Sequence, residues 1–591
     1  MILLINKGDY FKIEGVDAIE FQKQIKTLKN QILHGNNKDR FLVINGEAGS
    51  GKTIYSEQAL AELVQQDKKA IFVRKFVEDC QGSAMRINRY CKKEVANAIH
   101  AENYQDYKDM LDDYHILIIT HKRYTDLSKN KSERRRFAEN REVLIIDEEI
   151  DMLEEMTYTM QRIEEFDGML ERGIIRDLYT VCTREIESFL RTNKTKTFFK
   201  TSIDVSQELK QLKKLIKNSR LREFVKAKNF VFDDNIETAI ITKEEKDILL
   251  TKSDFINEIE VLENFINRTC YVENTHMYSF DRKIKFWKLE NNIILDASAS
   301  INSICQVGKQ FNLQKDKKVI NHSNWTMNVI NQNSSKSNKE KTENLYDVIN
   351  NEIANIEILG MFEKTLVIGA KDEQKHIKSS HSTDYNWFGN ITGKNDWKDF
   401  TRIFLIHNPQ FAFHTYIAKY QIYAGENSLL NESLGILRDG QVVRFMSEKL
   451  EKLRQTTIAA EIYQAIKRIN RLNRDDAEVY LMNHDTEIIN LVISQFQNIQ
   501  VHEYQLEKEI KYKESKMDKY NKRRKENSYA TAFIHLLSTL DKGKYKKKQL
   551  RELIGYKNNN TFARDVLNRI EVAEFMVANN IIAKGQSIFV N

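Results

Sequence analysis

Short apolar runs that end in a polar or glycine-containing turn recur along this chain, which is the pattern of buried parallel strands. Helical periodicity follows several of them, as in TIYSEQALAELVQQ after the first. This alternation predicts an α/β protein built on parallel sheets. The runs lie at 41–44, 70–74, 116–119, 143–146, 291–295, 365–370 and 402–406.

A different pattern occupies the middle of the chain. The 134 residues from Ile174 to Val307 contain neither glycine nor proline. Stretches such as SQELKQLKKLIKNSRLREFVKA show helical periodicity with alternating charge. We therefore expect a mainly helical insertion, over 152–285, within the first α/β domain.

The C-terminal region, 528–591, shows three apolar-periodic helical segments followed by IIAKGQSIFVN, a hairpin with Gly585 at its turn. This order predicts a winged-helix-like domain. Duplex binding would use its third helix, with Arg564 and Arg569, or its hairpin. A protein-interaction module of the same shape is the alternative.

Composition sharpens this picture. The chain has 591 residues, 41% of them hydrophobic, which is enough for several cores. Glycine occurs only 20 times and proline once, at Pro409, so the glycines indicate positions with special backbone needs.

Residues 505–591 hold 19 Lys/Arg against 10 Asp/Glu, whereas the net charge of the whole chain is only +7. A basic tail predicts a polyanionic partner, although a lysine-rich genome would also produce it.

Cysteine usage and hydropathy limit the class of protein. The five cysteines include no Cys-x-x-Cys pair, so we expect no disulfide framework, no zinc and no iron–sulfur cluster. The N-terminal apolar run is five residues long, and no later segment approaches 18 apolar residues. These features predict a soluble cytoplasmic protein without a membrane partner.

The clearest chemical signal is RFLVINGEAGSGKT, an apolar strand that enters a glycine-rich loop and then a helix. Such a loop presents backbone N–H groups to phosphates, while its lysine reaches the β- and γ-phosphates and its hydroxyl residue binds Mg²⁺. The predicted ATP-binding residues are Gly46, Gly49, Ser50, Gly51, Lys52 and Thr53.

A second signal is EVLIIDEEI, a buried strand that ends in carboxylates. Asp147 would hold Mg²⁺ together with Thr53, and Glu148 would polarise the attacking water. Two other strands end in polar pairs at the edge where α/β sheets bind ligands. These pairs, the predicted nucleic-acid contacts of the first domain, are Arg74 with Lys75 and Thr120 with His121. His121 could equally be a satisfied core histidine.

The segment EIYQAIKRINR carries Gln464, Arg468 and Arg471 at i, i+4 and i+7, which places them on one face of a predicted helix. That face would present arginines to a γ-phosphate across a domain cleft, although a solvated basic face is the alternative. A tight loop with Thr392, Gly393 and Asn395 precedes the strand at 402–406 and is a further predicted nucleic-acid contact.

In order, the motifs GEAGSGKT, ITH, DEEID, LDASAS, GNITGKND and QAIKRINR resemble motifs I, Ic, II, III, V and VI of superfamily 2 helicases. The arrangement is most similar to the XPD-like and DinG-like DNA helicases, or to phage and mobile-element helicases with an LDAT-type motif III. The resemblance implies an adenine-reading glutamine, assigned to Gln24. The chain departs from the pattern at Ile150, where histidine is expected, and at Lys467, where glycine is usual.

The resemblance implies two RecA-like motor domains, 1–300 and 301–500, a charged linker or helix at 501–527 and the winged-helix-like domain at 528–591. It implies catalytic roles for Lys52 and the carboxylates Asp147 and Glu148, together with Gln464, Arg468 and Arg471 of motif VI.

We therefore predict an ATP- and Mg²⁺-dependent DNA helicase or translocase acting on single-stranded and forked DNA, in replication or repair of a bacterium, phage or mobile element. Replication, repair or defence proteins would bind its insertion or C-terminal domain. A DNA-binding regulatory or defence NTPase without strand separation is the alternative, and an RNA helicase is a further one.

Overall fold

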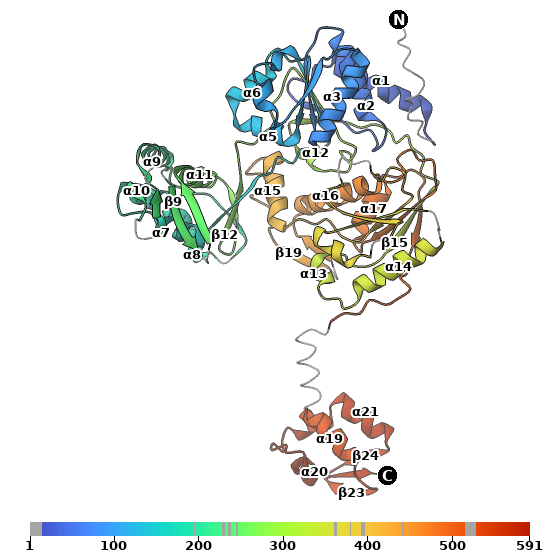
Figure 1. The fold of residues 1–591 in the computed structure, drawn as a ribbon. Coiled ribbons are helices and arrows are strands. Elements are labelled where there is room, and N and C mark those ends of the chain that lie inside the picture. Colours follow the sequence, from blue (N-terminus) through green and yellow to red (C-terminus); the bar gives the residue numbers. More distant parts are fainter. Residues whose placement is uncertain are drawn as a thin grey trace. The chain divides into compact units, whose positions relative to one another are not determined.

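The computed structural model divides into two compact units, one of residues 1–340 and 346–508 and one of residues 341–345 and 509–591. Figure 1 shows the fold of each unit. The described residues are 15–193, 195–226, 231–233, 238–243, 246–359, 363–378, 380–391, 396–439, 442–513 and 528–590.

The first sheet of the larger unit has seven strands, all parallel. Every strand predicted from the apolar runs of this region is present. In sheet order the strands are β14 (Phe311–Gln314), β1 (Phe41–Ile44), β13 (Asn291–Leu295), β5 (Val143–Asp147), β2 (Ala70–Arg74), β4 (Ile116–Thr120) and β3 (Ala96–Ile99).

Helices cover both faces of this sheet, because its strands are apolar on both sides. Ile71 and Val73 pack in one hydrophobic cluster with helices α5 (His121–Lys129) and α6 (Lys131–Ala138). Ala70 and Phe72 pack in another cluster. That cluster includes α1 (Ala18–His34), α2 (Lys52–Val64) and α3 (Val77–Cys91). The period of two along each strand therefore sends alternate side chains to opposite helical layers.

The chain leaves this sheet after β5 and returns to it at β13, and the insertion lies between. Its helices are α7 (Met160–Met169), α8 (Ile174–Thr192), α9 (Ser206–Asn218), α10 (Leu221–Phe224) and α11 (Lys252–Leu262). They share a core of their own with part of a four-stranded antiparallel sheet, which helical periodicity did not predict. The strands of that sheet are β6 (Glu155–Thr159), β12 (His276–Phe280), β11 (Cys270–Glu273) and β7 (Thr197–Phe199).

A second sheet, of six parallel strands, follows. Helices α16 (Glu448–Ile466) and α17 (Thr486–Ile493) pack on it through apolar residues such as Tyr463 and Val492. Two such sheets with helices confirm the α/β class and the two RecA-like domains. The strands are β17 (Thr383–Trp387), β16 (Thr365–Gly369), β18 (Arg402–Leu405), β21 (Ala477–Met482), β15 (Trp325–Ile330) and β22 (Gln500–Glu503).

The two halves of this unit also share hydrophobic packing. Tyr416 and Tyr423 of α15 (Phe413–Ala424), which follows β18 in the chain, lie in one cluster with Tyr124 and Trp287 of the first half. In addition, Arg282 donates to Glu426 over 2.5 Å. Contacts between residues that are distant in sequence therefore join the two RecA-like halves.

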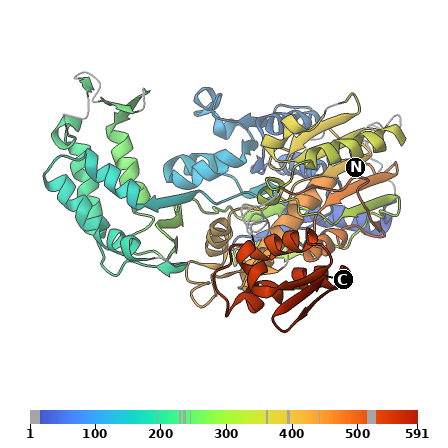
Figure 2. The same cartoon turned by 90° about the horizontal axis from the view of Figure 1, so that it is seen from below.

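The smaller unit has helices along one side and a three-stranded antiparallel sheet along the other (Figure 2). The helices are α19 (Tyr529–Ser538), α20 (Lys547–Leu553), the π-helical turn Ala563–Leu567 and α21 (Ile570–Ala578). The strands are β23 (Gly543–Lys546), β25 (Ser587–Val590) and β24 (Ile581–Lys584).

The structure confirms one prediction for this region and contradicts another. The hairpin with Gly585 at its turn is confirmed, and this glycine has φ +57°. The prediction of one continuous third helix was wrong, because Arg569 adopts an extended backbone and separates two shorter helices.

Candidate functional site

The glycine-rich loop joins β1 to α2, and its backbone allows a ligand to come close on its concave side. Gly49 and Gly51 have φ +85° and +77°, a region that disfavours side chains, and Gly51 is the residue before the helix. A Cβ at Gly46 would lie 3.1 Å from Cδ of Lys52. The open backbone and the N-terminus of α2 together form a cradle for an anion.

Lys52 lies inside this cradle. Its Nζ donates to the carbonyl oxygens of Gly46 and Glu47, the second over 2.9 Å. Burial lowers the pKa of Lys52 to about 8, against the attraction of Asp147 and Asp296. A buried cation that contacts only backbone carbonyls gains a stronger partner when a phosphate enters, so the cradle fits a nucleotide phosphate.

Thr53 and Asp147 meet beside the cradle, where the Thr53 hydroxyl donates to Oδ2 of Asp147 over 2.8 Å. Both groups present oxygen, the donor that Mg²⁺ prefers, and Mg²⁺ completes its shell with water and substrate phosphates. The described residues include no group of three or more His, Cys, Asp or Glu side chains able to hold a metal by themselves. One hydroxyl and one carboxylate nevertheless fit a metal that is shared with a phosphate.

Glu148 is the next residue and is placed by an unusual backbone. Its φ of +70° lies in the left-handed region, and its N–H donates to the Leu295 carbonyl oxygen over 2.9 Å. Burial opposes ionisation of its carboxyl, but Arg468, Lys75 and His121 outweigh burial and hold its pKa below the usual range. Oε2 has no hydrogen-bond partner among the described residues, so a charged acceptor faces the site.

The strand β13 carries a third carboxylate into the centre of the site, because β13 lies between β1 and β5. Asp296 is buried and accepts hydrogen bonds from the backbone N–H and hydroxyl of Ser298, over 2.8 and 2.7 Å. Ser298 in turn accepts one from Gln464 over 3.1 Å. This chain of bonds connects the first sheet to α16 of the second half.

Two more contacts complete that connection. The N–H of Ala48 in the phosphate loop donates to the Tyr463 hydroxyl over 3.2 Å, and Arg468 lies 3.4 Å from Oε1 of Glu148. Gln464 and Arg468, predicted to act together, are therefore both brought to the site.

The predicted helix through Gln464, Arg468 and Arg471 was wrong in its length. Helix α16 ends at Ile466. The N–H groups of Lys467, Arg468 and Ile469 still donate to carbonyls three or four residues earlier, and the N–H groups after them find partners elsewhere. Those of Asn470 and Arg471 donate to the carbonyls of Phe400 and Lys398, over 2.8 and 3.0 Å. Both arginines thus lie on a turn, and a Cβ at Gly49 would lie 3.4 Å from the Arg471 carbonyl oxygen. Burial, with the nearby Arg468, lowers the pKa of Arg471 to about 10.

The predicted nucleic-acid contacts at the ends of β2 and β4 lie close to the same carboxylates. Arg74 is only 8% exposed and lies 3.1 Å from Oδ2 of Asp147. Lys75 is partly buried, and burial lowers its pKa against the attraction of Glu148. Nε2 of His121 hydrogen-bonds to the Asp147 carbonyl oxygen over 2.8 Å. Thr120 caps helix α5 by accepting from the Arg123 N–H.

Two other sets of predicted residues lie outside this cluster. Thr392, Gly393 and Asn395 fall outside the described residues. Gln24, predicted to read adenine, lies on α1 and donates to the carbonyl oxygen of Lys317 over 2.8 Å.

Glu47 was missed by the sequence analysis, although it lies in the middle of the loop motif. It is 2% exposed, and its Oε2 accepts the backbone N–H groups of Val319 and Ile320 over 2.6 and 2.9 Å. These residues belong to the connector, 315–324, which joins β14 to β15. A carboxylate in a loop that is predicted to bind anions is unfavourable unless it has another partner. The presence of Glu47 in this loop could therefore have indicated that its side chain points to a separate partner.

Lys467 approaches the same connector from the second half. It is buried, and its Nζ lies 3.0 Å from Nε2 of His322. Burial lowers the pKa of Lys467 to about 8. Lys467, which stands where glycine is usual in motif VI, therefore contacts the connector between the two large sheets.

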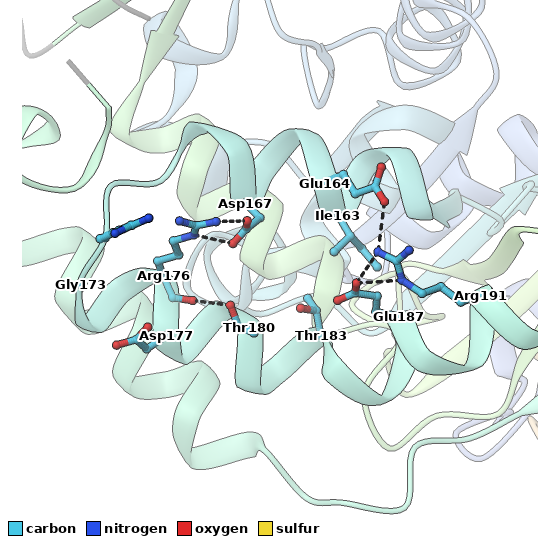
Figure 3. Close-up of a pocket in the computed structure, with 11 residues that line it drawn as sticks. Ile163, Glu164, Asp167, Gly173, Arg176, Asp177, Thr180, Thr183, Glu187 and Arg191 are labelled. Carbon is cyan, nitrogen blue, oxygen red and sulfur yellow. Dashed lines mark hydrogen bonds and ion pairs between the residues drawn. The ribbon is translucent and has the colours of Figure 1, made fainter. Parts of the chain in front are cut away.

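A separate pocket of about 620 Å³ lies in the insertion, between α7 and α8 (Figure 3). Its charged groups largely neutralise one another, because Arg176 pairs with Asp167 and Arg191 with Glu187. It shares no residue with the nucleotide site.

Comparison with known proteins gives one family. Residues 22–183 match the model of the DEAD/DEAH box helicase family. No curated protein matches the chain. No helix within the described ranges is long and apolar enough to cross a membrane.

Solved structures that are similar include XPD in its apo form, at 12% identity over 81% of this chain and 100% of that one, with a TM-score of 0.45. S. tokodaii Xpd4 matches at 11% identity over 82% and 99%, with a TM-score of 0.46. S. cerevisiae Dbp5 bound to RNA and ADP BeF3 matches at 10% over 86% and 97%, with a TM-score of 0.34. Similarity at this level carries no assignment of substrate.

Proposed function

Residues 22–183 match the DEAD/DEAH box helicase family, and from that premise we propose that this chain is an ATP-dependent DNA helicase or translocase of superfamily 2. The observation that carries the proposal is the two-sided nucleotide site. The first half contributes Lys52, Asp147 and Glu148. From the second half Arg468 contacts Glu148, and Gln464 donates to Ser298.

In the proposed mechanism the glycine-rich loop and Lys52 hold the β- and γ-phosphates of ATP. Thr53 and Asp147 hold Mg²⁺, which neutralises developing charge on the phosphate oxygens when it is bound. Glu148 accepts a hydrogen bond from the attacking water and orients it. Its low pKa keeps it ionised for this task.

Arg468 and Arg471 are proposed to stabilise charge on the γ-phosphate from the opposite side. In the structure Arg468 contacts Glu148, so a γ-phosphate that enters between them would exchange one anionic partner for another. Residues that act from two sheets make hydrolysis sensitive to how the sheets are arranged.

The same contacts would connect hydrolysis to movement. Ala48 to Tyr463 and Ser298 to Gln464 are hydrogen bonds across the two halves, and both lie within one or two residues of groups that meet the nucleotide. A change at the nucleotide therefore changes the relative stability of closed and open arrangements. Movement along a strand requires that the affinity for the strand differ between these states.

The nucleic-acid path is proposed to cross the carboxyl edges of both sheets, where Lys75 and the loop with Thr392, Gly393 and Asn395 would contribute. Contacts to phosphate and sugar would make binding independent of sequence and sensitive to salt. The boundaries predicted at 300 and 500 each fall too early, because β14 pairs with β1 in the first sheet and β22 pairs with β15 in the second. The winged-helix-like domain at 528–591, the cytoplasmic setting and a role in replication or repair are part of this proposal.

The test uses purified full-length protein with Lys52→Ala and Glu148→Gln as variants. Both should abolish ATP hydrolysis and leave single-strand binding measurable, because neither side chain is assigned to the strand. Glu62→Gln, an exposed carboxylate on the same helix as Lys52, is the control and should hydrolyse ATP normally. Hydrolysis at the wild-type rate by either site variant would refute the site assignment.

A strand-displacement assay then examines the activity itself. Labelled duplexes with a 5′ tail, a 3′ tail or a fork, in DNA and in RNA, are offered with ATP. Displacement of DNA supports the proposal, and the tail that is needed identifies the direction. Hydrolysis that no strand stimulates and that displaces nothing would instead support a regulatory NTPase, and displacement confined to RNA would overturn the choice of DNA.

A further inference from the structure

The outer face of the small sheet in the C-terminal unit is defined by strand register. Lys544 of β23 and Ile582 of β24 pair with Phe589 of β25, and Lys546 and Lys584 pair with Ser587. Directly paired residues lie on the same face of an antiparallel sheet. One face therefore carries Lys544, Lys546, Phe589, Ser587, Ile582 and Lys584.

The opposite face is the one that packs on the helices. Ile588 and Ile581 are buried in the core of this unit, and Tyr545 and Val590 pack against it. The outer face lies away from this core: its three lysines are exposed, Ile582 is 55% exposed and Phe589 is half-buried. Phe589 is thus an aromatic ring on a face that the helices do not cover.

Charge on this face has one sign. The strands β23, β24 and β25 contain no Asp or Glu, and among the described residues their three lysines form no ion pair. Residues 528–590 hold 10 Lys/Arg against 5 Asp/Glu, a net +5. Nζ of Lys544 lies 5.6 Å from the Phe589 ring centroid, and Lys546 and Lys584 flank Ser587, two residues along the same strand.

The arginines that were predicted to bind duplex are placed differently. Arg564 pairs with Asp565 over 2.7 Å, and Nε of Arg569 donates to the Asp565 carbonyl oxygen. An anionic ligand would have to compete with Asp565 for Arg564, whereas the lysines of the sheet have no such competitor among the described residues. The sheet face therefore offers lysines that an anion could bind without displacing a carboxylate, next to an aromatic ring.

The spacing fits a chain of phosphates with bases that are free to stack. Lys544 and Lys546 are two residues apart on one strand, about 7 Å, and Lys546 and Lys584 are two strands apart, about 10 Å. An aromatic ring with lysines around it is the arrangement that binds single strands, since every base has a face that stacks and every nucleotide has a phosphate. A rigid duplex keeps its base faces covered and could not use Phe589.

We propose that this sheet face binds single-stranded DNA, with Phe589 stacking on a base and Lys544, Lys546 and Lys584 contacting phosphates. The choice of DNA rests on the proposed function, while the single-stranded form rests on the face itself. The site would hold one separated strand and is an addition to the path across the two large sheets.

The test compares two double variants of the full chain that remove equal charge. Lys544→Gln/Lys546→Gln alters the face, whereas Lys548→Gln/Lys557→Gln alters exposed lysines elsewhere in the unit. Binding of a fluorescent (dT)₂₀ is measured over a range of salt. The face variant should lower the slope of log K against log salt by about 1.4, or 0.7 per phosphate contact, and the control by clearly less.

Phe589 is tested separately. Phe589→Ala should weaken (dT)₂₀ binding by roughly 5- to 150-fold, the range expected for loss of one base stack, and Phe589→Trp should retain it. The chain has four other tryptophans, so the readout in Phe589→Trp is the quenching by (dT)₂₀ in excess of that of the wild type, which reports on this position. Hydrolysis of ATP without a strand should stay unchanged in all variants, because none of these residues belongs to the nucleotide site.

Several outcomes would overturn the proposal. These are equal losses in both double variants, no quenching in Phe589→Trp in excess of the wild type, tighter binding of duplex than of (dT)₂₀, tighter binding of (rU)₂₀, or equal competition by polyglutamate. Failure of strand displacement by the wild-type protein would refute the helicase proposal, but it would leave the binding comparison on this face intact.

Discussion

Replacing Glu47 by alanine should loosen the connector between the two large sheets without removing the nucleotide-binding groups. The carboxylate of Glu47 is the acceptor for two buried backbone donors, those of Val319 and Ile320. Both of these connector residues are nearly inaccessible to water, at 2% and 1% exposure. Alanine leaves both N–H groups without the acceptor they have in the structure.

The magnitude follows from these two bonds. A hydrogen bond to a charged group contributes about 1.5–3 kcal/mol, and a buried donor left unsatisfied costs about 1–3 kcal/mol. Removal of the carboxylate also ends the cost of burying it, and its Oε1 has no hydrogen-bond partner among the described residues. We therefore expect the local opening free energy of the connector to fall by about 2–5 kcal/mol. Glutamine keeps a neutral acceptor and should cost about half as much.

Hydrogen–deuterium exchange read by mass spectrometry measures this directly on peptides that cover 315–324. In Glu47→Ala, exchange there should be faster by roughly 30-fold to several thousand-fold, since each 1.4 kcal/mol is a factor of ten. A peptide from β16 should exchange as in the wild type. ATP should still bind, because Lys52 and the loop backbone are retained, whereas strand-stimulated hydrolysis should fall.

Glu62→Ala is the matched control, since it removes a carboxylate that forms a partly exposed ion pair with Lys29. Such pairs contribute about 0–1 kcal/mol, so exchange of the connector should not change. Unchanged connector exchange in Glu47→Ala, or an equal effect of Glu62→Ala, would refute the reasoning that Glu47 holds the connector.

Three further predictions concern the same site and the tail. Burial raises the pKa of Glu149 from its ordinary 4.5 to about 8, so the folded protein binds this proton more tightly and loses stability as pH rises between these values. Glu149→Gln keeps the acceptor for Asn302 and should make the free energy of unfolding less dependent on pH. Urea denaturation from pH 5 to 9 measures this, and a decline as steep in Glu149→Gln as in the wild type would contradict the prediction. Arg468→Lys should lower the turnover number at least tenfold with little change in ATP affinity, measured by steady-state kinetics, because one ammonium cannot reproduce the guanidinium fork; wild-type turnover would argue against its role. Deletion of 528–591 should weaken DNA binding more than basal hydrolysis, and unchanged anisotropy titrations would disprove a role of the tail in binding.

Local features were predictable because neighbouring residues determine them. The apolar runs of β1, β5 and β13 need both faces buried whatever the rest of the chain does, so they predict parallel strands. The loop could be predicted since Gly49 and Gly51 adopt backbone angles that other residues avoid. A carboxylate directly after a buried strand must lie at its carboxyl end, so Asp147 and Glu148 were placed correctly beside the loop.

Features that depend on distant partners were not predictable in the same way. Periodicity extended the helix through Arg471, but the helix ends at Ile466, and the N–H groups of Asn470 and Arg471 donate to the carbonyls of Phe400 and Lys398 instead. Arg74 and His121 contact Asp147, which the sequence did not predict because the proximity of these residues depends on the order of strands in the sheet. No local pattern encodes that order.

By itself, then, the sequence determined the two α/β motor domains, the phosphate loop and its carboxylates, because each rests on short-range backbone preference and burial of adjacent residues. Only the tertiary structure decided what each of these groups touches. It placed Glu47 against the connector, Arg468 against Glu148, and Phe589 among three lysines, since these contacts join residues that hydrophobic packing brings together across long stretches of chain.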